Sequence, residues 1–229
     1  MIALIAGSIT RGRQRDALMQ ADPDLILADS SLARPALTLG KTIFADRCAS
    51  CHGAAGKAVH AGIPDLTDKD WLYGSGRISE IEQITLHGIR SGDPKGWNLA
   101  SMPAYATPRP YGREAIAPLR PGEIRDLAAF LVGLRGIASD PASATRGQGL
   151  YAGRGGCFDC HSPDAQGDSA IGAPNLIDKV WLYGDGSAGS LFRSVAYGRA
   201  GISPAFARTL TPVEARAVSV YVAALKDKP

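Results

Sequence analysis

Four cysteines stand in two copies of one pattern, and this pattern carries the clearest chemistry in the sequence. Residues 48–52 and 157–161 both read C-x-x-C-H, and the chain contains no other cysteine. Two thiols one helical turn apart can add to the two vinyl groups of one porphyrin, and the adjacent His then ligates the iron. A thiol–disulfide or zinc site is the alternative for a single C-x-x-C, but two copies with the same trailing His favour two covalently attached haem c groups. The residues assigned to them are Cys48, Cys51, His52, Cys157, Cys160 and His161.

The length and composition agree with two small domains that each enclose a haem. The chain has 229 residues, of which 45% are hydrophobic but only 7% aromatic. An internal repeat divides it into halves of ordinary domain size, and a buried haem would supply the apolar bulk that each half lacks. The formal charge of +3 gives no support to nucleic-acid binding. Because haem attachment uses all four cysteines, we expect no structural disulfide.

The N-terminus begins with an apolar run, residues 1–10, which is followed by a basic cluster. The run is too short to span a bilayer, which needs roughly 20 apolar residues, and it lacks the features of a signal peptide. It is either a flexible or partner-packed end or the remnant of an anchor or signal. Haem is attached to C-x-x-C-H outside the cytoplasm, which favours the remnant and a periplasmic location. We expect residues 1–33 to form a lead-in without a transmembrane span.

The repeats predict an all-α fold of two tandem domains, residues 34–136 and 137–229, each wrapped around one haem. Apolar residues at helical spacing predict that each domain ends in a helix, over residues 121–134 and 212–225. Thr211, Pro212 and Glu214 form the capping-box start of the second of these helices.

Each repeat also begins with a helix in which a Gly precedes an aromatic residue. Gly40 precedes Phe44 in the first repeat, and Gly147 precedes Tyr151 in the second. A Gly at this position suggests a helix that crosses another helix closely. The candidate partners are the last helices of each half.

Residues 62–74 and 172–184 are the most specific part of the repeat. Pro64 and Pro174 have free carbonyls and fixed turns, so we expect them to accept the N–H of the proximal imidazole and orient its ring. Buried indole and phenol groups need hydrogen-bond acceptors. Donation to haem propionates is one role for these residues, and packing in the core is the alternative. These donors belong to Trp71, Tyr73, Trp181 and Tyr183.

Two arginines follow matched glycines in the repeats. Arg90 and Arg199 come shortly after Gly88 and Gly198. A guanidinium can bind a haem propionate in bidentate fashion, and a solvated surface position is the competing interpretation.

The repeated GIPDLTDKDWLYG and GAPNLIDKVWLYG, with SMPAY following the first, resemble the dihaem subunit of cbb3-type cytochrome c oxidases (subunit III, CcoP/FixP-like). The resemblance covers roughly residues 20–225. It implies two cytochrome-c-like domains that pass electrons to a catalytic oxidase subunit, each haem being held by a His and by the Met of an M-P-A sequence. Met102-Pro103-Ala104 matches in the first domain, so the resemblance makes Met102 the sixth ligand of the first haem.

The second repeat departs from this pattern. Its matching sequence begins with Ser203, where the family has Met, and it lacks a counterpart of SGDPKGWNL. We therefore expect the second haem to have no Met ligand, a weakly ligated distal side and the lower potential of the pair. A transmembrane helix, which the family normally has at its N-terminus, is also absent.

Two further histidines, His60 and His87, are expected at the surface or near a propionate, with ligation of the second iron as the minority alternative. The sequence therefore predicts an electron-transfer protein whose redox partner is a membrane oxidase or another respiratory complex. A haem enzyme or small-ligand sensor that uses the second haem is the alternative. A haem subunit of a periplasmic dehydrogenase is another, and it differs from the first reading only in its partner.

Overall fold

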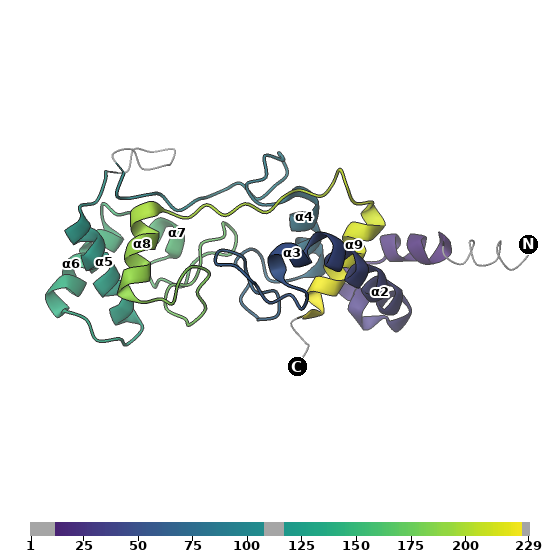
Figure 1. Cartoon of the computed structure of the whole chain (residues 1–229), viewed down its shortest axis with the longest axis horizontal. Coiled ribbons are helices and arrows are strands. Elements are labelled where there is room, and N and C mark those ends of the chain that lie inside the picture. Colours follow the sequence, from purple (N-terminus) through teal and green to yellow (C-terminus); the bar gives the residue numbers. More distant parts are fainter. Residues whose placement is uncertain (1–11, 108–116, 226–229) are drawn as a thin grey trace, which may run out of the picture. The chain divides into compact units, whose positions relative to one another are not determined.

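The computed structural model describes residues 12–107 and 117–225 (Figure 1). Within these residues the regular elements are helices, and pairing of extended backbone is confined to isolated bridges. The predicted all-α class is confirmed. Residues 12–20 are helical, and the elements after them are η1 (Pro23–Ala28), α2 (Ser30–Arg47), α3 (Ala49–His52), α4 (Ile78–His87), α5 (Pro121–Leu134), α6 (Pro141–Ala152), α7 (Phe158–His161), α8 (Ala188–Tyr197) and α9 (Pro212–Ala223).

The two expected terminal helices are α5 and α9, and each begins with Pro in its first turn. The capping box predicted for α9 is present, because Glu214 Oε2 accepts from the Thr211 N–H at 2.8 Å and the Glu214 N–H donates to Thr211 Oγ1 at 3.3 Å. The apolar run of residues 1–10 lies outside the described residues. No described helix is long and apolar enough to cross a membrane.

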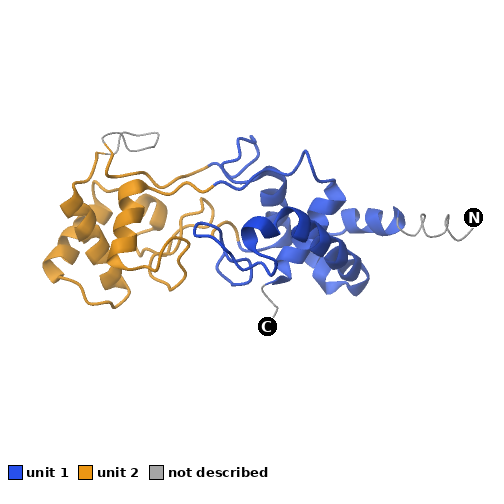
Figure 2. Cartoon of the chain, viewed as in Figure 1, with its two compact units in different colours: residues 1–71, 75–98, 202–229 blue, residues 72–74, 99–201 orange. Residues whose placement is uncertain are grey.

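The chain divides into two compact units that do not coincide with the two sequence repeats (Figure 2). Within the described residues, unit 1 holds residues 12–71, 75–98 and 202–225, and unit 2 holds the remainder. Each unit therefore contains one C-x-x-C-H motif and the terminal helix of the other repeat. This differs from the predicted domains 34–136 and 137–229, because α5 and α9 have exchanged places.

In unit 1, the close helix crossing expected at Gly40 is formed with α9. A Cβ atom at Gly40 would lie 2.1 Å from the carbonyl oxygen of Ala217, so only Gly allows the two backbones to approach this closely. One turn further along α2, the rings of Phe44 and Tyr221 lie 5.3 Å apart. The partner is a terminal helix, as expected, but it comes from the second repeat.

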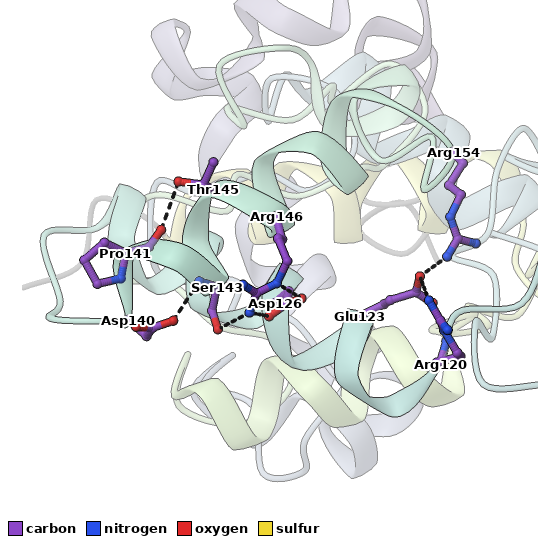
Figure 3. A network of polar contacts seen from close by, with 9 residues as sticks. All are labelled: Arg120, Glu123, Asp126, Asp140, Pro141, Ser143, Thr145, Arg146 and Arg154. Carbon is purple, nitrogen blue, oxygen red and sulfur yellow. Dashed lines mark hydrogen bonds and ion pairs between the residues drawn. The ribbon is translucent and has the colours of Figure 1, made fainter.

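Unit 2 has the matching arrangement between α6 and α5. A Cβ atom at Gly147 would lie 2.0 Å from the carbonyl oxygen of Asp126. The rings of Phe130 and Tyr151 lie 5.4 Å apart. Arg146 binds the Asp126 carboxylate through two hydrogen bonds of 2.8 and 2.9 Å, so the same helix pair is joined by a bidentate ion pair (Figure 3).

The N-terminal segment contributes to the core of unit 1 and is not a lead-in outside it. Leu18 and Ile26 are almost fully buried in the same apolar cluster as Phe44. Arg216 on α9 donates to the carbonyl oxygens of Leu18 and Ala21. The expectation for residues 1–33 is therefore corrected for the described part, because Leu18 and Ile26 are buried in the core of unit 1, although Leu25 and Leu27 are exposed.

Candidate haem sites

The first C-x-x-C-H motif follows directly on α2. Cys48 is the C-cap of α2, and residues 49–52 continue as the single turn α3, which brings His52 opposite the loop that contains Pro64. The Nδ1 atom of His52 lies 3.2 Å from the carbonyl oxygen of Pro64. A carbonyl can only accept, so Nδ1 carries the proton and Nε2 keeps its lone pair for a metal. Burial lowers the pKa of His52, which keeps the ring in the neutral, ligating form.

The second motif has the same geometry. Cys157 precedes the single turn α7, which ends at His161. His161 is buried, and its Nδ1 atom lies 2.9 Å from the carbonyl oxygen of Pro174. Burial again lowers the pKa of the imidazole. The structure thus brings together both His–Pro pairs expected from the repeat.

The environment of Cys48 and of Cys157 differs from that of the cysteines in redox-active dithiols. Burial raises the pKa of Cys48 and of Cys157 to about 11 in each case. Thiols that exchange disulfides have lowered pKa values, because the thiolate is the nucleophile. Cys48 and Cys157, each partly buried and close in sequence to an oriented imidazole, therefore fit thioether attachment of a haem better than thiol–disulfide exchange.

An unsatisfied donor also fits a bound haem in unit 2. The Nε1 atom of Trp181 is buried and has no hydrogen-bond partner among the described residues. A buried indole N–H needs an acceptor, and a haem propionate would supply one. The guanidinium of Arg135 lies 4.7 Å from the centre of the Trp181 ring and donates to the carbonyl oxygen of Gly186. Sequence reasoning missed Arg135, because it lies in the linker after α5 and has no counterpart in a repeated motif.

The other aromatic residues proposed for the sites are divided between the units. Trp71 packs against the core of unit 1. Tyr73 belongs to unit 2, where its ring fills the space beside Gly172. Tyr183 lies 4.2 Å below the guanidinium of Arg199. Tyr73 is thus separated from Trp71, its neighbour in the repeat.

The two arginines considered for propionate binding have different surroundings. Arg199 stacks on Tyr183 and donates to Ser194 Oγ, at 3.2 Å from Nε and 3.0 Å from Nη2. Arg90 adopts a positive φ of 48°, and its backbone N–H donates to the carbonyl oxygen of Trp97. The positive φ is uncommon for a residue other than Gly, and it fixes the turn that follows α4.

Met102 and Ser203 occupy equivalent positions in the repeats. Each lies in the unit that contains the C-x-x-C-H motif of the other repeat. Met102 belongs to unit 2, where it exchanges two backbone hydrogen bonds with Arg199. Ser203 belongs to unit 1 and exchanges the same pair of bonds with Ile89. The structure therefore places Met102 in the unit of His161 and not in the unit of His52.

Both remaining histidines lie in unit 1. His60 is exposed in the loop before Pro64. His87 ends α4, and its side chain is 15% exposed, with Nδ1 3.3 Å from Asp93 Oδ2. This contact is within ion-pair distance, although its geometry falls short of a hydrogen bond.

Comparisons with protein families match both repeats. Residues 37–135 match the family model of cytochrome c, and residues 142–222 match that of cbb3-type cytochrome c oxidase, subunit III. These matches follow the linear repeats, whereas the compact units exchange their terminal helices.

Similar proteins cover most of the chain. It is 38% identical over 219 residues to the cbb3-type cytochrome c oxidase subunit FixP of Bradyrhizobium sp. (strain ORS 278), with 94% of this chain and 70% of that protein covered. It is 36% identical over 205 residues to FixP of Azorhizobium caulinodans, covering 89% of this chain and 62% of that protein. It is also 36% identical over 218 residues to subunit CcoP of Rhodobacter capsulatus, covering 92% and 69%.

Proposed function

Because the chain belongs to the family of cbb3-type cytochrome c oxidase subunits represented by FixP and CcoP, we propose that it delivers electrons to the catalytic part of such an oxidase. The chain is a dihaem c-type cytochrome, an electron-transfer protein with two covalently bound haem c groups. The acceptor is inferred from the relatives, whose names place them in cbb3-type oxidases.

The observation that carries the proposal is an imidazole hydrogen-bonded to a proline carbonyl beside two attachment cysteines in each unit. Haem iron supplies reversible one-electron chemistry when it is bound. The proline carbonyls hold His52 and His161 in one tautomer and one orientation, and the thiols fix the porphyrin covalently. Fixed ligands and a buried site reduce structural change between redox states, which is what an electron carrier needs.

We further propose that the chain works in the periplasm, beside the outer face of the inner membrane. Haem attachment to C-x-x-C-H takes place outside the cytoplasm, and the relatives are subunits of cbb3-type cytochrome c oxidases by name. Fractionation of cells that express the protein tests this location. Recovery of the haem-loaded protein in the cytoplasm would contradict it.

Intact mass and electron transfer test the function in two steps. The denatured protein should exceed the mass of the bare chain by two haem groups; one haem, or bound zinc, would contradict the assignment. The ferrous protein, mixed with a cbb3-type oxidase that lacks its own FixP or CcoP subunit, should be oxidised in step with oxygen consumption. His52→Ala should disturb one haem, whereas the matched change of the exposed imidazole, His60→Ala, should leave both haem spectra unchanged.

A second function is favoured by Ser203, which stands at the Met position of unit 1. A serine hydroxyl is a poor ligand for haem iron, so one haem could bind a small molecule such as carbon monoxide. Binding of carbon monoxide to one of the two ferrous haems, together with failure to reduce the oxidase, would favour a sensor or enzyme. Service to a dehydrogenase in place of an oxidase is tested by co-purification in mild detergent.

A further inference from the structure

The placement of Met102 in unit 2 has a consequence for how the two haems differ. We propose that Met102 is the distal iron ligand of the haem attached at residues 157–161, and that the haem attached at residues 48–52 receives Ser203 at the equivalent position. The second haem is then ligated by a Met from the first repeat. The first haem receives a Ser from the second repeat and has no Met ligand at this position. The inference rests on the two haems of the proposed function and adds to it the difference between them.

The backbone of the segment that contains Met102 is fixed along α8 in unit 2. Met102 N–H donates to the carbonyl oxygen of Arg199 at 2.9 Å, and Arg199 N–H donates back to Met102 at 3.1 Å. Tyr105 N–H donates to the carbonyl oxygen of Val195 at 3.0 Å. Gly198 allows this approach, because a Cβ atom there would lie 2.5 Å from the Met102 carbonyl oxygen. The segment is thus held at both of its ends.

Tyr105 ties the same segment to the second attachment motif. Its hydroxyl donates to the carbonyl oxygen of Gly155 at 2.5 Å, and the Sγ atom of Cys157 lies 3.7 Å from that oxygen. Tyr105 is buried, and burial together with the nearby Cys157 sulfur raises its pKa above the ordinary value. A residue three positions after Met102 therefore touches the turn that carries a haem-attaching thiol.

The side chain of Met102 faces the interior of unit 2. It is partly buried and packs against the apolar cluster of that unit, as do Cys157, Leu176 and Trp181. A thioether is a soft ligand that haem iron accepts opposite His, and such ligation raises the potential. Met102 and the attachment residue Cys157 thus contact the same apolar cluster, and His161 of the same unit completes the His–Met pair needed to hold one haem.

Unit 1 repeats the framework without the thioether. Ser203 exchanges hydrogen bonds of 3.0 Å each way with Ile89, and Phe206 N–H donates to the carbonyl oxygen of Thr85, which matches the contact of Tyr105. Gly88 permits this approach, as Gly198 does in unit 2. The backbone therefore presents position 203 to the first haem as it presents position 102 to the second. The other described methionine, Met19, lies outside this framework in the helix of residues 12–20.

Nuclear magnetic resonance of the intact dihaem protein tests the assignment. In the diamagnetic ferrous form, the methyl group of an iron-bound Met is shifted strongly upfield by the porphyrin ring current. Nuclear Overhauser contacts should lead from this methyl group to one porphyrin, and from its thioether bridges to the β protons of Cys157 and Cys160. A path that ends at Cys48 and Cys51, or the absence of a shifted Met methyl group, would overturn the proposal.

Variants give an independent measurement. Met102→Leu should abolish the ferric charge-transfer band typical of sulfur ligation, while the matched Met19→Leu should leave it unchanged. Ser203→Met should produce a second shifted methyl signal, connected to Cys48 and Cys51, and raise the lower of the two potentials. If this second signal connects to Cys157 and Cys160 instead, ligation does not cross the repeats. A protein without two haems by mass would contradict the proposed function, which separates that failure from a wrong ligand assignment.

Discussion

The close approach of α6 to α5 at Gly147 can be tested by adding one methyl group. In Gly147→Ala the new Cβ atom would lie 2.0 Å from the carbonyl oxygen of Asp126. That oxygen belongs to a helix backbone and cannot move alone. The helices must therefore separate by more than about 1 Å to restore an ordinary van der Waals distance between the new Cβ atom and this oxygen. Overpacking of this kind costs typically 1–3 kcal/mol, and the better helix propensity of Ala returns about 1 kcal/mol. We expect a net destabilisation of up to about 2 kcal/mol.

Gly149→Ala is the matched control, two residues further along α6. No atom lies within 4 Å of a Cβ at Gly149, so this variant should only gain helix propensity, about 0.5–1 kcal/mol. Because the chain forms two units, a single unfolding free energy is not well defined. Hydrogen exchange of the α5 and α6 amides, measured by mass spectrometry on the holoprotein, reports on unit 2 alone. Exchange should be faster in Gly147→Ala and slower in Gly149→Ala; equal protection in both variants would refute the helix crossing.

Three further predictions concern the exchange of helices, the N-terminal segment and acid stability. A double-mutant cycle with Phe44→Leu and Tyr221→Leu should give a coupling of about 0.5–1.5 kcal/mol, whereas the cycle of Phe44 with Phe130, which an unexchanged fold would pair, should give about zero. Removal of residues 1–30 should lower the thermal stability of unit 1, measured by the hydrogen exchange of α9, while the exchange of α6 stays unchanged. Hydrogen bonds from Arg120 hold the pKa of Glu123 at about 2, so its contribution to stability is present above the ordinary Glu pKa and is lost as the pH falls through about 2. Glu123→Gln should therefore flatten the acid limb of a pH–stability curve, and an unchanged limb would contradict this.

The attachment sites could be predicted because their residues are close in sequence. The spacing within residues 48–52 and 157–161 already fixes two thiols and an imidazole on one turn. Pro64 and Pro174 follow each motif at nearly the same separation, so their contact with the imidazoles depends only on a short loop. The fold class follows from helical periodicity in the same local way.

The exchange of helices could not be predicted, because the repeats are too similar. Gly40 and Phe44 are as complementary to α5 as to α9, since Phe130 and Tyr221 occupy equivalent positions. The buried Arg216–Glu82 ion pair at 2.6 Å is one long-range contact that the exchanged helix makes in unit 1. Breaking such a buried pair typically costs 3–5 kcal/mol. The expectation that Met102 and His52 ligate the same haem depended on which terminal helix belongs to which unit.

The contacts of the buried Arg216 also imply an order in which unit 1 is completed during synthesis. It lies on α9, and its partners include the carbonyl oxygens of Leu18 and Ala21, which are among the first described residues to be synthesised. At synthesis rates of about 5–20 residues per second, α2 waits on the order of 10 s before α9 exists to cover it. The helix pair α5 and α6 is joined by a short linker and needs no such delay. The motif nearest the N-terminus is therefore enclosed by its terminal helix only after nearly all of the described chain has been synthesised.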